Sequence, residues 1–343
     1  MEPIIHLQDV CKEFRVLNRH EGLKGSLQDL FSHDYKTVHA VNHVSMDIQP
    51  GEIVGYLGPN GAGKSTTIKM MTGVLQPTSG ELLVQGRVPH RDRARNAQEI
   101  GVVFGQRSQL WWALPLVESF RILKDMYCIP DAAYREMLDL YESLVDLKEL
   151  YGKPVRQMSL GQRTLSDILA AFLHNPGVVF LDEPTIGLDV SMKSKIRKLV
   201  QALNREKNTT VILTTHDMGD VDALCQRIVI IDKGTMLYDN DITHLRRFFG
   251  AYRTMKLQLH PEGTVRDADA EALHALLQAA CPSATLQVTP NEAWLDILIN
   301  EDEVDPLTVL NAVQKQQKIY DMRLEEISTE DVIRKIYEGG VAE

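Results

Sequence analysis

The chain has few of the features that mark secreted, membrane-spanning or metal-binding proteins. Its 343 residues include four cysteines, which are isolated from one another and form no Cys-x-x-Cys pair. Without paired cysteines or a histidine cluster, the sequence offers neither a disulfide framework nor a zinc site. No apolar run approaches the ~20 residues of a membrane span, and Met-Glu-Pro-Ile-Ile lacks the basic and apolar parts of a signal peptide. We therefore expect reduced thiols in the cytoplasm, and any membrane part on another chain.

A surplus of cations is also absent. The chain holds 37 Lys and Arg against 47 Asp and Glu, and residues 251–343 contribute 8 and 17 of these. The acidity therefore belongs to the C-terminal part, while residues 1–250 are nearly neutral. Because nucleic-acid affinity rests largely on cationic contacts, this balance argues against a DNA or RNA partner. The length predicts about two domains, and 44% hydrophobic with 24% charged residues is ordinary for a soluble globular protein.

A glycine-rich segment follows a short apolar run near residue 58. The run at 52–57 predicts a buried strand and the residues from Lys64 onward predict a helix, which is the setting that a P-loop requires. Glycines let backbone N–H groups surround phosphate oxygens, and the helix N-terminus adds positive charge. Lys64 would reach the terminal phosphates, and the Ser65 hydroxyl would hold Mg²⁺. The predicted nucleotide-binding residues here are Gly58, Pro59, Asn60, Gly61, Ala62, Gly63, Lys64, Ser65 and Thr66.

Two carboxylates follow a second apolar run. Residues 177–181 predict a buried parallel strand that leads into Asp182 and Glu183. Sheets of this class present ligand-binding residues at the carboxyl ends of their strands. We expect Asp182 to order Mg²⁺ or its waters, and Glu183 to polarise the water that attacks the γ-phosphate.

These segments, together with Met158-Ser-Leu-Gly-Gln162, resemble the ATP-binding cassette ATPases over about residues 4–245. In that family the signature loop of one cassette caps the ATP held by the P-loop of another. The resemblance therefore implies a head-to-tail homodimer that binds ATP and Mg²⁺, with Ser159, Gly161 and Gln162 acting in trans. The sequence departs from the usual signature at Met158, normally Leu, at Leu160, normally Gly, and at Leu165, where a basic residue is common.

The same resemblance implies roles for four further residues. Gln106 matches the Q-loop that senses Mg²⁺ and links chemistry to the coupling surface, with Gln109 a weaker candidate and a solvent-facing loop glutamine the alternative. His216, after the apolar strand at 210–215, resembles the switch histidine at the γ-phosphate. Asp189 resembles the D-loop aspartate at the dimer interface. Phe14 resembles the aromatic residue that stacks on adenine, with Tyr35 or a purely structural role as alternatives.

Two segments and a C-terminal region lie outside these motifs. Residues 19–35 predict a short amphipathic helix that contacts a permease, the membrane surface or its own cassette. Trp111 and Trp112 follow the Q-loop and predict either a docking cleft or core packing. The C-terminal region predicts, in order, a strand at 254–259, a helix at 268–280, strands at 284–289 and 292–299 joined by a turn at Pro290-Asn291, a helix at 305–316, a strand at 319–325 and a helix at 329–338.

The predicted fold is thus an α/β P-loop cassette followed by a small α+β domain. Residues 1–245 form the cassette, with a mixed sheet core and a helical subdomain at about 107–175. The order βαββαβ over residues 251–343 predicts a ferredoxin-like accessory domain.

The predicted function is the ATP-hydrolysing subunit of an exporter, resembling the drug and viologen exporter branch. It would work with a separate integral-membrane permease from the cytoplasmic face of the cell membrane. An importer subunit is the alternative. A cassette for DNA repair or translation is disfavoured by the single cassette, the missing zinc motifs and the absence of a long heptad run. A module that binds ATP without turnover is disfavoured because Glu183 and His216 are both present.

Overall fold

The structure, a computed structural model, describes residues 2–17, 35–105, 108–244, 252–259, 265–327, 331–333 and 336. Gln106 and almost all of the segment 19–35 lie outside these residues. The chain divides into two compact units, Met1–Asp241 and Ile242–Glu343. Among the described residues, no helix has the length and apolar character that crossing a bilayer requires.

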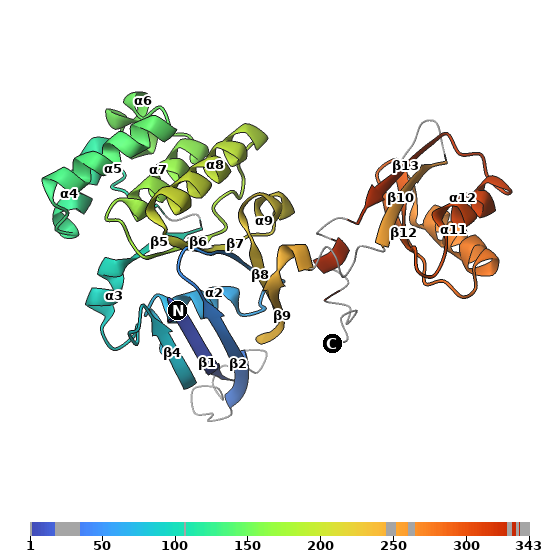
Figure 1. The fold of residues 1–343 in the computed structure, drawn as a ribbon, viewed down its shortest axis with the longest axis horizontal. Helices are drawn as coiled ribbons and strands as arrows, with labels where there is room; N and C mark the ends of the chain where they lie inside the picture. Colours follow the sequence, from blue (N-terminus) through green and yellow to red (C-terminus); the bar gives the residue numbers. More distant parts are fainter. Residues whose placement is uncertain are drawn as a thin grey trace, which may run out of the picture. The chain divides into compact units, whose positions relative to one another are not determined.

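A six-stranded sheet forms the centre of the first unit, in the order β5-β6-β7-β3-β8-β9 (Figure 1). The first five strands in this order pair in parallel, and β9 pairs antiparallel with β8. Because β6, β7 and β3 are neighbours, their carboxyl ends meet at one edge of the sheet. The strands are β3 (Ile53–Leu57), β5 (Ile100–Phe104), β6 (Val178–Asp182), β7 (Thr210–Thr214), β8 (Arg227–Asp232) and β9 (Thr235–Asp241).

An antiparallel sheet packs against this centre through one helix and through a direct backbone hydrogen bond of 2.8 Å, from the Asn42 N–H to the Gly234 carbonyl. It has the order β2-β1-β4 and consists of β1 (Ile5–Leu17), β2 (Tyr35–Ile48) and β4 (Ser79–Val84). A single buried cluster contains Leu7 of this sheet, Tyr56 and Phe180 of the central sheet, and Ile68 of the helix α2 (Lys64–Met71). Burying side chains of this size contributes roughly 1.5–3 kcal/mol each, so α2 is held firmly between the two sheets.

Four helices between β5 and β6 form a separate layer (Figure 1). The buried Tyr141 hydroxyl donates to the Leu169 carbonyl at 2.6 Å and joins two of these helices. The helices are α4 (Leu116–Met126), α5 (Asp131–Leu144), α6 (Lys148–Tyr151) and α7 (Leu160–Phe172), with a 3₁₀ turn at Val155–Gln157.

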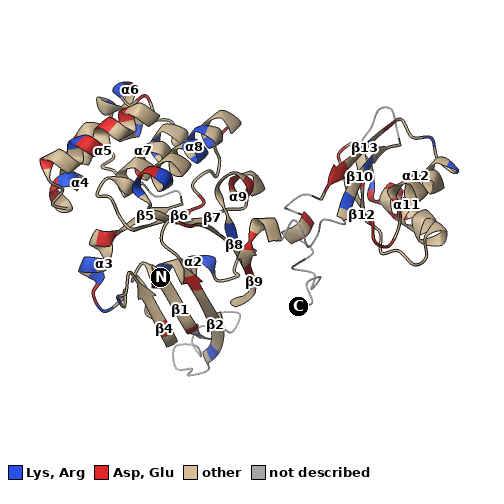
Figure 2. Cartoon of the chain, in the orientation of Figure 1, with Lys and Arg blue, Asp and Glu red and all other residues tan. Residues whose placement is uncertain are grey.

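Three further helices complete the description of this unit, namely α3 (Arg93–Glu99), α8 (Val190–Lys207) and α9 (Met218–Leu224). Helix α8 carries six Lys and Arg against one Glu, and Figure 2 shows these cations in blue along it. Its apolar face, which includes Ile196, Leu199 and Leu203, is buried. Since the buried and charged positions alternate with helical spacing, α8 has one face in the core and cations on the remainder.

The described part of the second unit contains an antiparallel sheet and two helices of nine or more residues. Residues 331–333 and 336 are also helical, and the other residues of the helix expected at 329–338 lie outside the described part. Its elements follow the order strand, helix, strand, strand, helix, strand, and its sheet has the order β11-β12-β10-β13. Leu273 and Leu277 of α11 and Val309 of α12 pack with Leu295 and Ile297 of β12 in one buried cluster. The elements are β10 (Tyr252–Gln258), α11 (Asp267–Ala280), β11 (Gln287–Asn291), β12 (Trp294–Asn300), α12 (Pro306–Gln314) and β13 (Asp321–Glu326).

The prediction of a turn at Pro290-Asn291 is wrong. Both residues belong to β11, and Asn291 pairs with Trp294 across a two-residue loop, Glu292–Ala293. Glu292 takes the left-handed conformation there, with φ of 53°. Proline is tolerated in β11 because this strand lies at the edge of the sheet, where a missing N–H breaks no ladder.

Candidate functional site

The loop between β3 and α2 lies so close to the backbone of neighbouring segments that two positions require glycine. Gly63 precedes α2 with φ of 108°, and a Cβ there would lie 2.3 Å from the Ala40 carbonyl oxygen. A Cβ at Gly58 would lie 2.5 Å from the Ile231 carbonyl oxygen. Both positions therefore exclude any side chain, and the loop backbone can face an anion at the helix N-terminus.

Lys64 lies within the curl of this loop. Its Nζ donates to the Gly58 carbonyl at 2.5 Å and to the Pro59 carbonyl at 3.1 Å. Burial lowers the pKa of the Lys64 ammonium, while the carboxylates of Glu183 and Asp182 act in the opposite direction. A partly desolvated cation with only neutral carbonyl acceptors suits a phosphate, because the anion would supply the missing charge. Ser65 and Thr66, the next two residues, lie in the first turn of α2.

The two carboxylates lie at the end of β6. Asp182 is its last residue, and its Oδ1 accepts a hydrogen bond of 2.6 Å from the Thr214 hydroxyl of β7. Glu183 follows with φ of 52°, and its backbone N–H donates to the Thr214 carbonyl at 3.0 Å. A left-handed conformation at a glutamate is strained, and such strain is typical of functional positions. Thr214 therefore holds the carboxylate of Asp182 and the backbone of Glu183, a role that sequence patterns did not reveal.

His216 is directed at Glu183. Its Nε2 lies 2.8 Å from Glu183 Oε1, and both side chains keep partial solvent access, with 47% and 27% exposed. The two residues follow β7 and β6, which are neighbours, so the sheet brings them together from positions 33 residues apart in the sequence. Lys64 follows β3, which belongs to the same sheet. One edge of the sheet therefore carries the loop of Lys64, the carboxylate of Glu183 and the imidazole of His216.

The segment Ser159–Gln162 opens α7 with a capping box. The Gln162 N–H donates to Ser159 Oγ at 3.2 Å, and Gln162 Oε1 accepts from the Ser159 N–H at 3.1 Å and from Lys153 Nζ at 2.8 Å. This reciprocal pattern stabilises the helix start by about 1 kcal/mol and holds the loop in place. Gly161 is buried against Met192, since a Cβ there would lie 2.5 Å from Met192 Cγ.

The three departures from the usual signature differ in their surroundings. Met158 and Leu165 are each only 5% exposed, so both belong to the core, where an apolar side chain fits. Leu160 is 46% exposed at the start of α7. The departures at Met158 and Leu165 therefore alter packing beneath the loop, while that at Leu160 places an aliphatic side chain on the surface.

Asp189 caps α8. Its Oδ1 accepts a hydrogen bond of 2.9 Å from the Met192 N–H. Ile186, three residues before Asp189, is 47% exposed. Val190, directly after Asp189, is 84% exposed. The segment 186–190 contacts the signature segment, because a Cβ at Gly187 would lie 3.4 Å from Leu160 Cδ2.

The remaining sequence-predicted residues are placed as follows. Phe14 is on β1, 37% exposed, with Lys12 Nζ 5.2 Å from its ring centroid. Tyr35, at the start of β2, is 52% exposed. Gln106 lies outside the described residues. Gln109 is tied to α7, because its N–H donates to Asp167 Oδ1 and its side-chain amide to the Asp167 carbonyl, both at 3.1 Å.

The donor set fits Mg²⁺ better than a softer metal. Asp182 and the Ser65 hydroxyl are hard oxygen donors, and the described residues contain no group of three or more His, Cys, Asp or Glu that could hold an ion. Mg²⁺ characteristically takes one or two protein oxygens and completes its shell with waters and substrate phosphates. The two residues therefore fit an ion that arrives with a nucleotide.

The fold and this site define a P-loop ATPase. The protein-family model described as "ABC transporter" matches residues 41–186. The ABC transporter ATP-binding protein NatA of Bacillus subtilis is 32% identical over 208 residues, which are 61% of this chain and 84% of that protein. The chain therefore belongs to the ABC transporter family, as its resemblance indicated, and it carries an ATP-binding cassette whose class of activity is ATP hydrolysis.

Other relatives are much longer than the region they share with this chain. ABC transporter A family member 1 of Dictyostelium discoideum is 34% identical over 229 residues, 67% of this chain but 26% of that protein. The chain thus spans about a quarter of the length of this relative. A solved structure entitled "Dimeric structure of a post-hydrolysis state of the ATP-binding cassette MJ0796 bound to ADP and Pi" has a TM-score of 0.56 and 25% identity, covering 69% of this chain and 98% of that one.

Proposed function

We propose that the chain is the ATP-hydrolysing subunit of an exporter, in which two copies bind two ATP molecules head to tail. The observation that carries this proposal is the 2.8 Å contact between His216 and Glu183 beside the Lys64 loop. Glu183 polarises the attacking water, and His216 holds that carboxylate and contacts the γ-phosphate. Lys64 and the loop N–H groups of residues 58–66 bind the phosphates.

Mg²⁺ would be held by Ser65 and Asp182, with Gln106 as a further ligand, and would neutralise charge on the phosphates. The chain's own contribution is orientation. The Thr214 hydroxyl holds one oxygen of Asp182 at 2.6 Å, which fixes this carboxylate at the end of β6. Adenine would stack on Phe14, whose exposed ring lies on β1.

Dimerisation is supported by an exposed apolar surface. Leu160, Ile186 and Val190 are 46%, 47% and 84% exposed and lie in the two segments that contact the second nucleotide and second subunit in this family. We call these three residues the 160/186/190 patch. Ser159, Gly161, Gln162 and Asp189 would accompany the patch into the interface. The fold resemblance to a dimeric cassette bound to ADP and Pi supports the same arrangement.

A separate permease would dock near the tryptophan segment. Trp112 is 56% exposed, and the Arg163 guanidinium lies 4.5 Å from its ring centroid. Trp111 is 36% exposed, and both residues follow the segment that Asp167 anchors to α7. Exposed aromatic side chains paired with arginine are typical of binding hot spots. This would place the chain peripherally on the cytoplasmic face of the membrane.

Two domain assignments accompany this proposal. Residues 1–245 would form the cassette with a helical subdomain at about 107–175, and residues 251–343 an accessory ferredoxin-like domain. The element order strand, helix, strand, strand, helix, strand and the antiparallel order β11-β12-β10-β13 support the latter. The direction of transport is proposed from the resemblance of the cassette to the exporter branch. In vesicles carrying the chain with its permease, substrate should leave the cassette side, and the opposite direction would contradict export.

The central experiment is Glu183→Gln. The amide cannot accept a proton from water but preserves the size of the side chain, so ATP should bind with wild-type affinity while turnover falls at least a hundredfold. The stalled variant should form an ATP-dependent dimer, measured by light scattering with and without Mg²⁺ and ATP. Wild-type turnover in this variant would exclude Glu183 as the catalytic base.

A further inference from the structure

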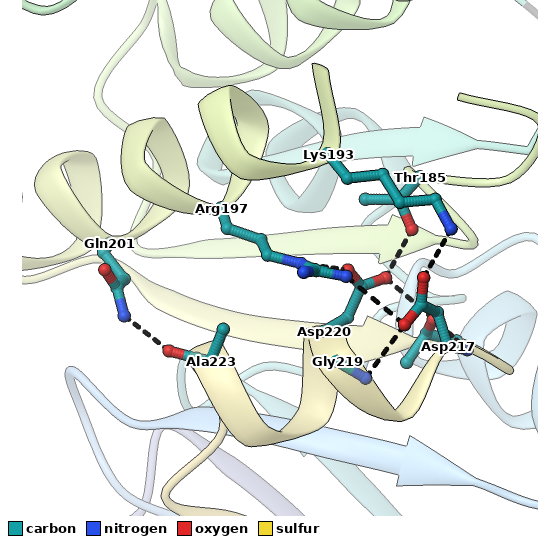
Figure 3. Close-up of polar contacts among 9 residues, drawn as sticks. Thr185, Lys193, Arg197, Gln201, Asp217, Gly219, Asp220 and Ala223 are labelled. Atoms are coloured by element: carbon teal, nitrogen blue, oxygen red, sulfur yellow. Dashed lines mark hydrogen bonds and ion pairs between the residues drawn. The ribbon is translucent and has the colours of Figure 1, made fainter. Parts of the chain in front are cut away.

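A network of charged side chains joins α8 to the residues around His216 (Figure 3). Lys193 Nζ donates to Asp217 Oδ2 at 2.5 Å. Arg197 bridges two acids, with its Nε 2.6 Å from Asp220 Oδ1 and one terminal nitrogen 3.3 Å from Asp217 Oδ1. The cations come from one helix, and both acids follow His216 within four residues. The network thus connects a helix that starts on the surface with the segment that carries the imidazole.

Asp220 connects the network to both catalytic segments. It is fully buried, and its Oδ2 accepts hydrogen bonds from the hydroxyls of Thr185 and Thr215, the latter at 2.9 Å. Thr185 lies two residues after Glu183, and Thr215 immediately precedes His216. One buried carboxylate therefore fixes the backbone on both sides of the contact between Glu183 and His216.

Asp217 is also held by hydrogen bonds to neighbouring residues. Its Oδ1 accepts from the Gly219 N–H at 2.8 Å, and its own N–H donates to Thr215 Oγ1 at 2.9 Å. Burial acts to raise the pKa of Asp217, but Lys193, the Gly219 N–H and Arg197 outweigh it, and the pKa is lowered. The carboxylate is thus ionised at neutral pH. Because it directly follows His216, its anchoring restricts where the imidazole can lie.

Stability alone explains such a network poorly. Desolvating an arginine and an aspartate costs several kcal/mol, and apolar residues of similar volume often stabilise a protein as well or better. Elsewhere the interface of α8 and α9 is satisfied by a simple neutral bond, from Gln201 Nε2 to the Ala223 carbonyl at 2.5 Å. The charges are concentrated at the end of α9 that adjoins His216, which indicates a role in positioning this residue.

Helix α8 also reaches the proposed dimer interface. Asp189 caps its first turn, and Val190, the first helical residue, is 84% exposed. Lys193 and Arg197 follow one and two turns later on the same helix, within about 10 Å along the axis. A displacement of the start of α8 would therefore move both cations together with it.

We propose that Lys193 and Arg197 are positioning residues for ATP hydrolysis, which hold His216 against Glu183 through Asp217 and Asp220 and tie that contact to the exposed start of α8. The inference rests on the proposed function, since it assumes that Glu183 and His216 act on the γ-phosphate. Partner binding at the 160/186/190 patch would then set the position of His216 in the same subunit.

The test compares two polar residues of α8. Arg197→Gln removes the bridge, and Gln201→Ala removes a neutral bond between the same two helices (Figure 3). We expect Arg197→Gln to lower kcat about tenfold to a hundredfold with KM for ATP within twofold, because a misplacement near 1 Å has this effect on chemistry. Gln201→Ala should stay within twofold in both constants. Equal kcat values for the two variants would overturn the inference.

A steric variant covers the case in which Arg197→Gln does not fold. A Cβ at Gly219 would lie 3.0 Å from one terminal nitrogen of Arg197 and 3.0 Å from Asp217 Oδ1, so Gly219→Ala disturbs this ion pair without removing charge. Gly152→Ala is the control, because a Cβ there meets nothing within 4 Å. Gly219→Ala should lower kcat severalfold, and Gly152→Ala should not. Wild-type kcat in folded Gly219→Ala would count against the inference.

Double variants separate positioning from a general structural role. In a His216→Ala background, Arg197→Gln should lower the residual rate by less than twofold, because the residue that it positions is gone. The same tenfold or larger loss in both backgrounds would overturn the inference. Retained turnover in Glu183→Gln would overturn the proposed function and this inference with it. Stalled Glu183→Gln beside fully active Arg197→Gln would overturn the inference alone.

Discussion

At the residue scale, buried polar groups of this protein are placed where they hold loops that carry function. Thr214 holds Asp182 and Glu183, and Asp220 holds the two segments that carry Glu183 and His216. Asp167 does the same for the residues after the Q-loop, since its Oδ1 accepts from the Ser108 hydroxyl at 2.9 Å and from the Gln109 N–H at 3.1 Å. Burying each of these groups costs desolvation energy, and the hydrogen bonds that it makes hold a loop in one geometry.

The ionisation of Asp167 makes stability depend on pH. Burial raises the pKa of Asp167 from 3.8 to about 6, against the hydrogen bonds of Ser108 and Gln109. The folded state therefore binds this proton more tightly than the unfolded state. The stability that the protonated group contributes is fully present below about pH 4 and is lost as pH rises through about 6, by roughly 3 kcal/mol at 1.36 kcal/mol per pKa unit.

Asp167→Asn should remove this dependence. The amide oxygen can accept the same two hydrogen bonds and does not ionise, so the variant should gain stability relative to wild type as pH rises from 4 to 7. Urea unfolding at each pH measures the difference. Asp139→Asn, on the exposed face of α5, controls for the loss of a negative charge. A constant difference between Asp167→Asn and wild type across this range would contradict the assignment.

At the element scale, the sequence predicted structure that forms within a short stretch of chain better than contacts between distant segments. The strand, loop and helix around Lys64 could be predicted because the glycines and the apolar run lie within 20 residues of one another. The turn at Pro290-Asn291 was misplaced because an edge strand tolerates proline, and edge position is a property of the assembled sheet. Thr214 and Asp220 were missed for a related reason, since their partners Asp182 and Thr185 lie 32 and 35 residues away.

The contact between α7 and α8 gives a prediction at this scale. A Cβ at Gly161 would lie 2.5 Å from Met192 Cγ, so Gly161→Ala should force the methionine to move and destabilise the fold by about 1–2 kcal/mol. In a Met192→Ala background the same substitution should be neutral or stabilising by up to ~1 kcal/mol, since alanine favours the helix. Thermal unfolding of the four proteins completes the cycle. Equal effects of Gly161→Ala in both backgrounds would refute the contact.

At the scale of the whole molecule, the 160/186/190 patch is an unusual surface for a monomer. Its side chains come from the starts of α7 and α8 and from the loop after Glu183, so the patch borders a residue that we propose to be catalytic in the same subunit. Exposed aliphatic residues are individually ordinary, but three in neighbouring loops beside a functional site are typical of an interface. The proposed dimer would cover them.

Val190→Asp tests the interface without weakening the fold. Val190 is the first residue of α8, where a carboxylate interacts favourably with the helix dipole, so monomer stability should be unchanged or slightly higher. Placed in the Glu183→Gln background, the charge would be buried without a partner in the dimer, and ATP-dependent dimerisation should weaken at least tenfold. ATP binding by the monomer should remain within twofold of the parent variant.

Val74→Asp is the matched control, because Val74 is 53% exposed and lies between α2 and β4, away from the patch residues in sequence. It introduces the same charge on an exposed valine and should leave dimerisation intact. Analytical ultracentrifugation with saturating ATP compares the two variants at several concentrations. If both dimerise like the parent, the two copies do not meet through the start of α8. If both fail, the loss reflects added negative charge on an already acidic chain, and the patch has no special role.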